Sequence, residues 1–160
     1  MDEPRRAAVI ERRSFAGLCA GAIGMAVLAG AASAGAGTTD LIEATKRGDL
    51  AAVEALLAAG AAPDGHDRFN NTALIFAARD GFTAIARVLI TAGATVNWID
   101  GEGVTPLILA SFKNHPDIVS LLLDHGADPT IRDRWDRQAL DYALRRGTDD
   151  PIALMIQGRD

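Results

Sequence analysis

The sequence repeats with a period of 33 residues along most of its length. The period is visible in three columns, which are Leu41, Leu74, Leu107 and Leu140; Ala44, Ala77, Ala110 and Ala143; and Gly60, Gly93 and Gly126. A period of about 20 to 50 residues indicates a solenoid, in which one small unit stacks on copies of itself. We therefore expect a stacked scaffold, and a stacked scaffold favours a binding function.

Each unit is predicted to contain an inner helix, an outer helix and a hairpin. Thr72 and Thr105 are suited to capping the start of the inner helix, which is predicted over residues 73–79 in the second repeat. The outer helix is predicted over residues 83–92, because apolar residues recur there on one helical face. Corresponding turns carry residue types that tolerate a positive φ, and these are Asn70, Gly103 and Asp136.

One segment matches a known repeat pattern closely. Residues 93–107 read GATVNWIDGEGVTPL and resemble the ankyrin pattern G-A-D-V-N-x-x-D-x-x-G-x-T-P-L. The resemblance covers about residues 40–157 and implies an all-α solenoid of about four stacked helix-turn-helix units with β-hairpin-like fingers. The domain is expected over residues 40–160, with repeats at about 40–67, 68–100, 101–133 and 134–160.

The sequence departs from that pattern in two places. The histidine that usually follows Thr-Pro-Leu is replaced by Ile75, Ile108 and Asp141, so the hydrogen bonds that it makes between repeats in the family are absent. The last unit resembles a C-terminal cap, because Asp149, Asp150 and Pro151 stand where its outer helix would begin.

The first 34 residues have a different character. Arginines at positions 5, 6, 12 and 13 precede an uncharged apolar run over 15–32, and the small-x-small site Ala32-Ser33-Ala34 follows. This segment resembles a secretory signal peptide over residues 1–34, cleaved between Ala34 and Gly35, with a short linker over 35–39.

The sequence Arg12-Arg13-Ser14-Phe15 matches the core of the twin-arginine pattern, so the chain resembles small exported bacterial ankyrin-repeat proteins. A periplasmic location is expected. A retained membrane anchor stays open as an alternative, since about 18 uncharged residues approach the length needed to span a bilayer.

The expected mature chain offers little for catalysis. It has no cysteine, and its two serines, Ser111 and Ser120, lie in no nucleophile-elbow pattern. His66, His115 and His125 are scattered, and no zinc spacing, phosphate loop or dinucleotide fingerprint is present. We expect no enzymatic activity, no catalytic residue, no metal site and no cofactor.

The resemblance places binding on the concave face, which is formed by the finger tips and the exposed side of the inner helices. The candidate partner-binding residues there are Arg68, Phe69, Arg79, Trp98, Ile99, Glu102, Phe112, Lys113, Arg132, Arg134, Trp135, Arg137, Arg145 and Arg146. Removal of residues 1–34 leaves 12 Lys and Arg against 18 acids, yet most of those cations belong to this face. Segregated charge beside aromatic residues is typical of protein interfaces.

These observations predict an exported module that binds a protein partner with an acidic patch and supports a partner enzyme. Nucleic acid is a poor partner, because the sequence pI is about 5.1. No membrane contact is expected after signal removal, and no small-molecule substrate, because stacked repeats offer a groove instead of an enclosed pocket. Two alternatives stay open, an inhibitor or immunity protein that blocks a toxin or hydrolase, and a membrane-anchored structural adaptor.

Overall fold

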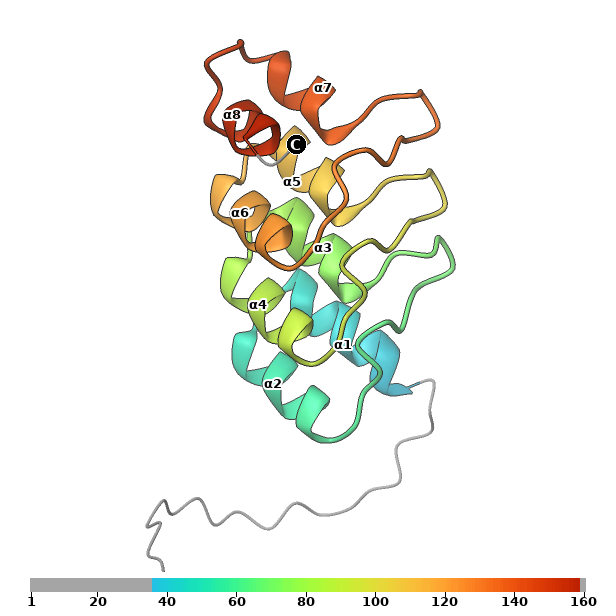
Figure 1. The fold of residues 1–160 in the computed structure, drawn as a ribbon. Coiled ribbons are helices and arrows are strands. Elements are labelled where there is room, and N and C mark those ends of the chain that lie inside the picture. Colours follow the sequence, from blue (N-terminus) through green and yellow to red (C-terminus); the bar gives the residue numbers. More distant parts are fainter. Residues whose placement is uncertain (1–35, 159–160) are drawn as a thin grey trace, which may run out of the picture. The chain divides into compact units, whose positions relative to one another are not determined.

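The structure, a computed structural model, describes residues 36–158 and contains eight α-helices in that range (Figure 1). The helices are α1 (Ala36–Lys46), α2 (Leu50–Ala58), α3 (Ala73–Asp80), α4 (Thr83–Thr91), α5 (Pro106–Lys113), α6 (Pro116–Asp124), α7 (Ala139–Leu144) and α8 (Pro151–Gln157). No β-strand occurs among these residues, and the hairpins contain a single isolated bridge, between His66 and Thr72. The all-α class expected from the sequence is confirmed.

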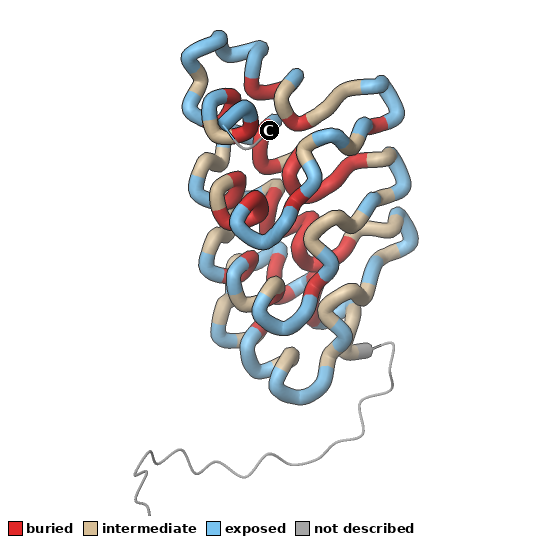
Figure 2. Tube along the Cα trace, in the orientation of Figure 1, coloured by how far each residue is buried: buried red, intermediate tan, exposed pale blue. Residues whose placement is uncertain are grey.

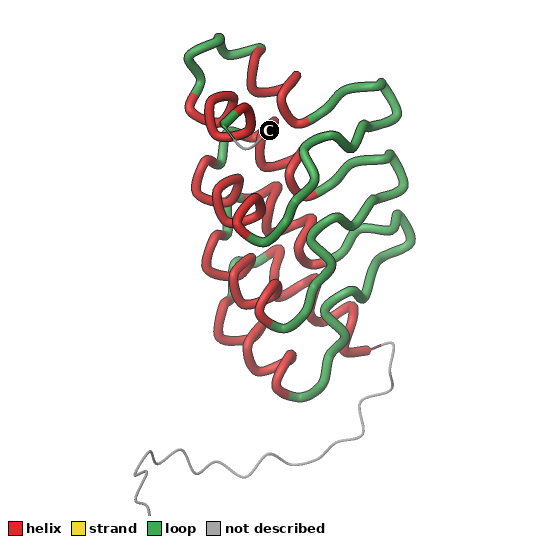
Figure 3. Tube along the Cα trace, viewed as in Figure 1, coloured by secondary structure: helices red, strands yellow, loops and turns green. Residues whose placement is uncertain are grey.

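The helices form two layers. The odd-numbered helices stack on one another as an inner layer, and the even-numbered helices form an outer layer beside them. Three long connections project from the inner layer on the side away from the outer helices, and they are drawn as green loops in Figure 3. These are the expected fingers, so the concave face is built from α1, α3, α5, α7 and the loops between repeats.

The core runs continuously between the two layers (Figure 2). Leu41, Leu74 and Leu107 are fully buried and occupy equivalent places in successive inner helices. Leu140 completes the column but is only partly buried. It belongs to the last repeat, and no further repeat follows it among the described residues. The 33-residue period therefore corresponds to real structural equivalence.

Local signals in the sequence account for the helix ends. The Thr72 side chain accepts a hydrogen bond from the Ile75 N–H, and Thr105 does the same for Ile108, which confirms both N-caps. The inner helix of the second repeat ends at Asp80, one residue later than predicted, and the outer helix ends at Thr91, one residue earlier. Differences of this size are usual at fraying helix ends.

The two end units differ from the sequence interpretation. Helix α1 begins at Ala36, inside the segment assigned to a linker over 35–39. In the last unit Asp150 caps α8 by accepting the N–H groups of Ile152 and Ala153, and Pro151 occupies the first turn, where a missing N–H costs nothing. This acidic segment delays the start of the outer helix and does not interrupt it. The signal segment 1–34 and the site Ala34/Gly35 lie outside the described residues.

Neighbouring repeats also meet at the tight turn between their helices. Gly81 has φ of 85°, and a Cβ there would lie 2.7 Å from the ring of His115, the residue before α6. The same ring places its Nε2 atom 3.2 Å from the Arg79 carbonyl oxygen. Glycine is required here both by the backbone conformation and by the close approach of the next repeat.

Candidate functional site

The three fingers share one internal geometry. Each finger contains an equivalent aspartate, which is Asp67, Asp100 or Asp133. Its carboxylate accepts hydrogen bonds from the backbone N–H groups of the residues two and four positions later, with N···O distances from 2.8 to 3.1 Å. The turn residues Asn70, Gly103 and Asp136 have φ of 64°, 80° and 61°. Three different residue types thus meet one backbone requirement, as predicted, and the aspartates are committed to the hairpin.

The fingers are joined to one another. The Gly101 N–H donates to the Phe69 carbonyl at 3.0 Å, and the Arg134 N–H donates to the Glu102 carbonyl at 3.2 Å. The Asn70 amide adds a hydrogen bond to the Ile99 carbonyl at 2.7 Å. These bonds hold the finger tips as one continuous surface, on which Phe69 and Ile99 remain exposed by 59% and 46%.

Trp98 has a structural role in this surface. Its indole N–H donates to the Asn70 carbonyl at 2.8 Å, and its ring lies against His66 with centroids 5.4 Å apart. The tryptophan therefore packs against the preceding finger. Its place among the partner-binding residues stays a prediction, and its contacts favour the interpretation that it packs between fingers.

Five of the candidate arginines form ion pairs within the chain. Arg79 binds Asp80 through two nitrogens at 2.8 Å, which raises the pKa of the guanidinium and lowers that of the carboxyl. The other pairs are Arg132 with Asp136, Arg134 with Glu102, Arg137 with Asp133 and Arg146 with Asp150. More acids oppose the basic face than the sequence indicated, because the finger and helix geometry brings them into reach.

Arg146 is the most deeply engaged of these five. Its Nε lies 2.7 Å from a carboxylate oxygen of Asp150, the N-cap of α8, and another of its nitrogens donates to the Ser111 carbonyl at 2.8 Å. One side chain thereby connects the third repeat, α7 and the start of α8. Its geometry is that of a structural residue.

Three candidate cations have no ion-pair partner among residues 36–158, namely Arg68, Lys113 and Arg145. Arg68 lies over the exposed Phe69 ring, Lys113 over Phe112 and Arg145 over Tyr142, at 4.7, 5.3 and 5.1 Å from the ring centroids. Stacking on a ring leaves the charge open to solvent and to a partner. Lys113 also lies close enough to Asp80 to help lower the pKa of that carboxyl, so Arg68 and Arg145 carry the least compensated charge of the three.

A groove of about 350 Å³ lies between α5 and α7 beneath the fingers. Its rim is formed by Phe112 and Trp135, which are 50% and 49% exposed. The residues that line it are Glu102, Val104, Ile108, Leu109, Phe112, Trp135, Arg137, Tyr142 and Arg145. The rim and the charges were expected from the sequence, whereas Ile108, Leu109 and Tyr142 were not.

The 33-residue period could have revealed Leu109 and Tyr142. Phe76, Leu109 and Tyr142 form one column, with a large apolar side chain in three successive repeats. The column was overlooked because its members vary between aliphatic and aromatic types. The column is the fourth residue of each inner helix, three residues before the exposed column of Arg79, Phe112 and Arg145.

The wall of the groove is held by a buried carboxylate. Asp133 accepts the hydroxyl of Tyr142 at 2.5 Å, and its partner Arg137 lies between the rings of Trp135 and Tyr142 at 4.8 and 4.7 Å. Burial by itself would raise the pKa of Asp133, but the hydrogen bonds from Tyr142 and from two backbone N–H groups outweigh it and the pKa lies below its usual range. Burial and the same hydrogen bond raise the pKa of Tyr142.

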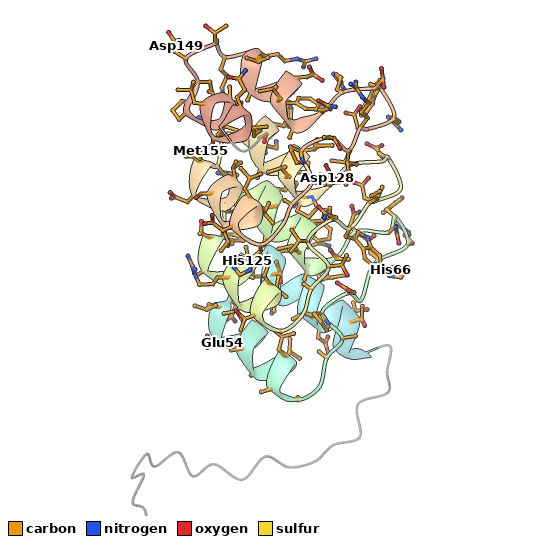
Figure 4. All side chains as sticks on the ribbon, in the orientation of Figure 1. Glu54, His66, His125, Asp128, Asp149 and Met155 are labelled. Carbon is orange, nitrogen blue, oxygen red and sulfur yellow. The ribbon has the colours of Figure 1, made fainter. Side chains whose placement is uncertain are left out.

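The described residues contain no cluster of three or more potential metal ligands. In Figure 4 His66 lies beside the fingers, whereas His125 lies with the outer helices. Ser111 is fully buried, so it is not presented to a substrate. Within residues 36–158 no helix is both long enough and apolar enough to cross a membrane.

Comparison with protein families identifies a known repeat. A family model described as ankyrin repeats (3 copies) matches residues 41–133 and, in a second alignment, residues 100–158. No match was found among curated proteins.

Proposed function

This chain belongs to the ankyrin-repeat family, and on that premise we propose that it is an exported module whose concave face binds a protein with an acidic patch. Ankyrin repeats generally act as protein-protein interaction modules and are typically not catalytic. The proposal concerns the class of partner, the face used and the location.

One observation carries the proposal. The groove between α5 and α7 has two half-exposed aromatic side chains on its rim. Arg145, which has no ion-pair partner among residues 36–158, lines the groove, and Lys113 lies over the Phe112 ring. Exposed aromatic residues flanked by open positive charge favour a partner that supplies apolar side chains and carboxylates. The five paired arginines contribute less, because their charges are already compensated within the chain.

The proposed location follows from the N-terminal sequence. The arginines, the apolar run and the Ala32-Ser33-Ala34 site support export through the twin-arginine route and a periplasmic destination. Mass spectrometry of the chain recovered from a bacterial host tests this. A mature chain that starts at Gly35 supports export, and an intact N-terminus recovered with the membrane argues for the anchored adaptor instead.

Capture from a periplasmic extract tests the function. The wild-type chain, Lys113→Glu and the control Arg87→Glu are compared, since both variants change the charge equally and Arg87 lies on the exposed side of the outer helix α4. We expect the wild-type chain to capture one protein. The amount captured should fall for Lys113→Glu, stay the same for Arg87→Glu, and decrease as salt rises from about 0.05 to about 0.5 M. Equal capture by both variants would reject the concave face as the binding surface.

The captured protein then decides what binding does. If it is an enzyme, its activity is measured with and without the chain. If the enzyme gains activity or stability, the chain supports its partner. If the enzyme loses activity, the chain is an inhibitor.

A further inference from the structure

One column of the repeat lies at the last turn of the inner helices, facing the concave surface. Its members are Lys46, Arg79, Phe112 and Arg145, so three positions carry a cation and one carries a phenyl ring. The exception in the third repeat coincides with the groove. The column therefore indicates where the face has been changed from a regular pattern.

Where the column carries cations, they cover the apolar ring beside them. The Lys46 ammonium and the Arg79 guanidinium lie 4.6 and 4.8 Å from the centroid of the Phe76 ring, on which both converge. Phe76 is buried as a result. At this junction the apolar side chain already has partners within the chain, and no apolar ligand is needed to cover it.

At the junction between α5 and α7 the covering cation is replaced. Phe112 stands where Arg79 stands one repeat earlier, and Leu109 stands where Phe76 stands. The Phe112 ring meets Tyr142 edge-on at 5.4 Å and remains half exposed. The half-exposed rings of Phe112 and Trp135 are therefore open to an occupant, whereas Ile108 and Tyr142 in the wall of the groove are themselves buried. Burial of apolar surface is what drives such an occupant to bind.

The charges at the rim define what must accompany that apolar group. Arg137 is held by Asp133, and Arg134 is held by Glu102, so neither is open to a new partner at full charge. Arg145 lines the groove at the C-terminal end of α7 and has no ion-pair partner among the described residues. A carboxylate at this end of the groove would meet its guanidinium.

From this arrangement we infer that the groove selects an extended peptide segment of the partner in which a large apolar side chain stands next to Asp or Glu. The apolar side chain enters between Phe112 and Trp135, and the carboxylate pairs with Arg145. Arg137 is a positioning residue, which holds the rings of Trp135 and Tyr142 apart. The inference rests on the proposed function and names the feature of the partner that this surface recognises.

Selection from a random heptapeptide library against the full-length chain tests the inference directly. The selected sequences are expected to contain Leu, Ile, Phe or Trp with an acid within two positions. Binding of synthetic copies is followed by tryptophan emission, because Trp135 lies on the groove rim. Absence of selected peptides, or enrichment of basic or uncharged sequences, overturns the inference.

Two variants locate the binding. Phe112→Arg restores the cation that the equivalent column positions carry, so the fold is expected to survive while peptide affinity falls by about tenfold or more. Arg145→Glu should weaken binding by about tenfold through charge reversal, and its charge-matched control Arg87→Glu should leave binding unchanged. Far-UV circular dichroism verifies that each variant is folded. Peptides that bind Phe112→Arg as well as wild type contradict the inference.

The remaining outcomes are distinguishable. If the natural partner is captured in a Lys113-dependent way but Phe112→Arg still binds it, the groove assignment fails and the proposed function stands. If sedimentation shows that the chain dimerises and that Phe112→Arg abolishes the dimer, the occupant is a second copy and the peptide inference is wrong.

Discussion

The junction between α1 and α3 and the junction between α5 and α7 are built from the same repeat, yet one is closed and the other is open. Phe76 at the first is covered by Lys46 and Arg79, whereas the second exposes Phe112 and Trp135 around a groove. A solenoid needs its buried columns to agree from repeat to repeat, but its exposed columns are free to vary. A binding surface can therefore arise from a substitution at one exposed position of the repeat, without altering how the repeats stack.

The largest test of this comparison concerns the buried column that both junctions share. Leu107 is 1% exposed between two neighbours, so Leu107→Ala should lower the free energy of unfolding by about 2 to 5 kcal/mol. The same change at Leu140, which is only partly buried, should cost less. Urea unfolding measures both. Equal losses would show that the last repeat is packed as tightly as the interior ones.

A second test examines the turn at the junction between α3 and α5, which lies between the two junctions compared. Gly81→Ala places a Cβ 2.7 Å from the His115 ring at a φ of 85°, whereas Gly93→Ala has a φ of 93° and meets nothing within 4 Å. Both variants should have a free energy of unfolding that is lower by about 1 to 2 kcal/mol, because alanine is strained in the left-handed backbone conformation. The loss should be larger for Gly81→Ala, since its Cβ also collides with the His115 ring. Thermal unfolding of the pair separates strain from contact. Identical midpoints would mean that the ring moves away freely.

The third test asks whether the buried carboxylate supports the open junction. Asp133 accepts a hydrogen bond from Tyr142 that Asp100, its equivalent one repeat earlier, lacks, because Leu109 stands in the tyrosine's place. Asp133→Asn should therefore cost about 1 to 3 kcal/mol and more than Asp100→Asn. Chemical unfolding at pH 7 gives both values.

The pH dependence of stability follows with a definite sign. The pKa of Asp133 lies below its unfolded value, so its contribution is fully present above about pH 4 and is lost as the pH falls through the lower folded pKa. Asp133→Asn should remove part of this acid-induced loss. If wild type and variant lose stability in parallel as the pH falls, Asp133 contributes little to acid unfolding.

The smallest expected effect lies at the finger tips. Arg134 and Glu102 form an exposed pair at 3.2 Å, with half of each side chain in solvent. Glu102→Gln should change stability by about 0 to 1 kcal/mol, because exposed pairs are screened. The same variant frees Arg134, so affinity for an acidic partner should rise slightly. A large loss of stability would show that the pair helps to hold the fingers together.

Much of the fold was predictable from the sequence because it depends on local requirements. Thr72, Thr105 and the positive-φ residues Asn70, Gly103 and Asp136 each satisfy a backbone need that few residue types can meet. The start of α8 was harder, since an acidic segment that appeared to interrupt a helix is its N-cap.

The site was only partly predictable. Phe112, Trp135 and Arg145 were identified because they stand at exposed register positions. The ion pairs of Arg134 and Arg146 were not, since their partners Glu102 and Asp150 belong to another finger and to another helix. A register shows which side a residue faces but does not show which charge lies opposite it.

The 33-residue period is enough to establish that this protein is a stack of repeated units, because buried columns repeat only when each unit packs on a copy of itself. Which exposed groups remain open to a partner depends on the folded chain. The pair of Arg134 with Glu102 and the contact of Phe112 with Tyr142 join different repeats, and the remaining ion pairs need the local geometry of each finger and helix end.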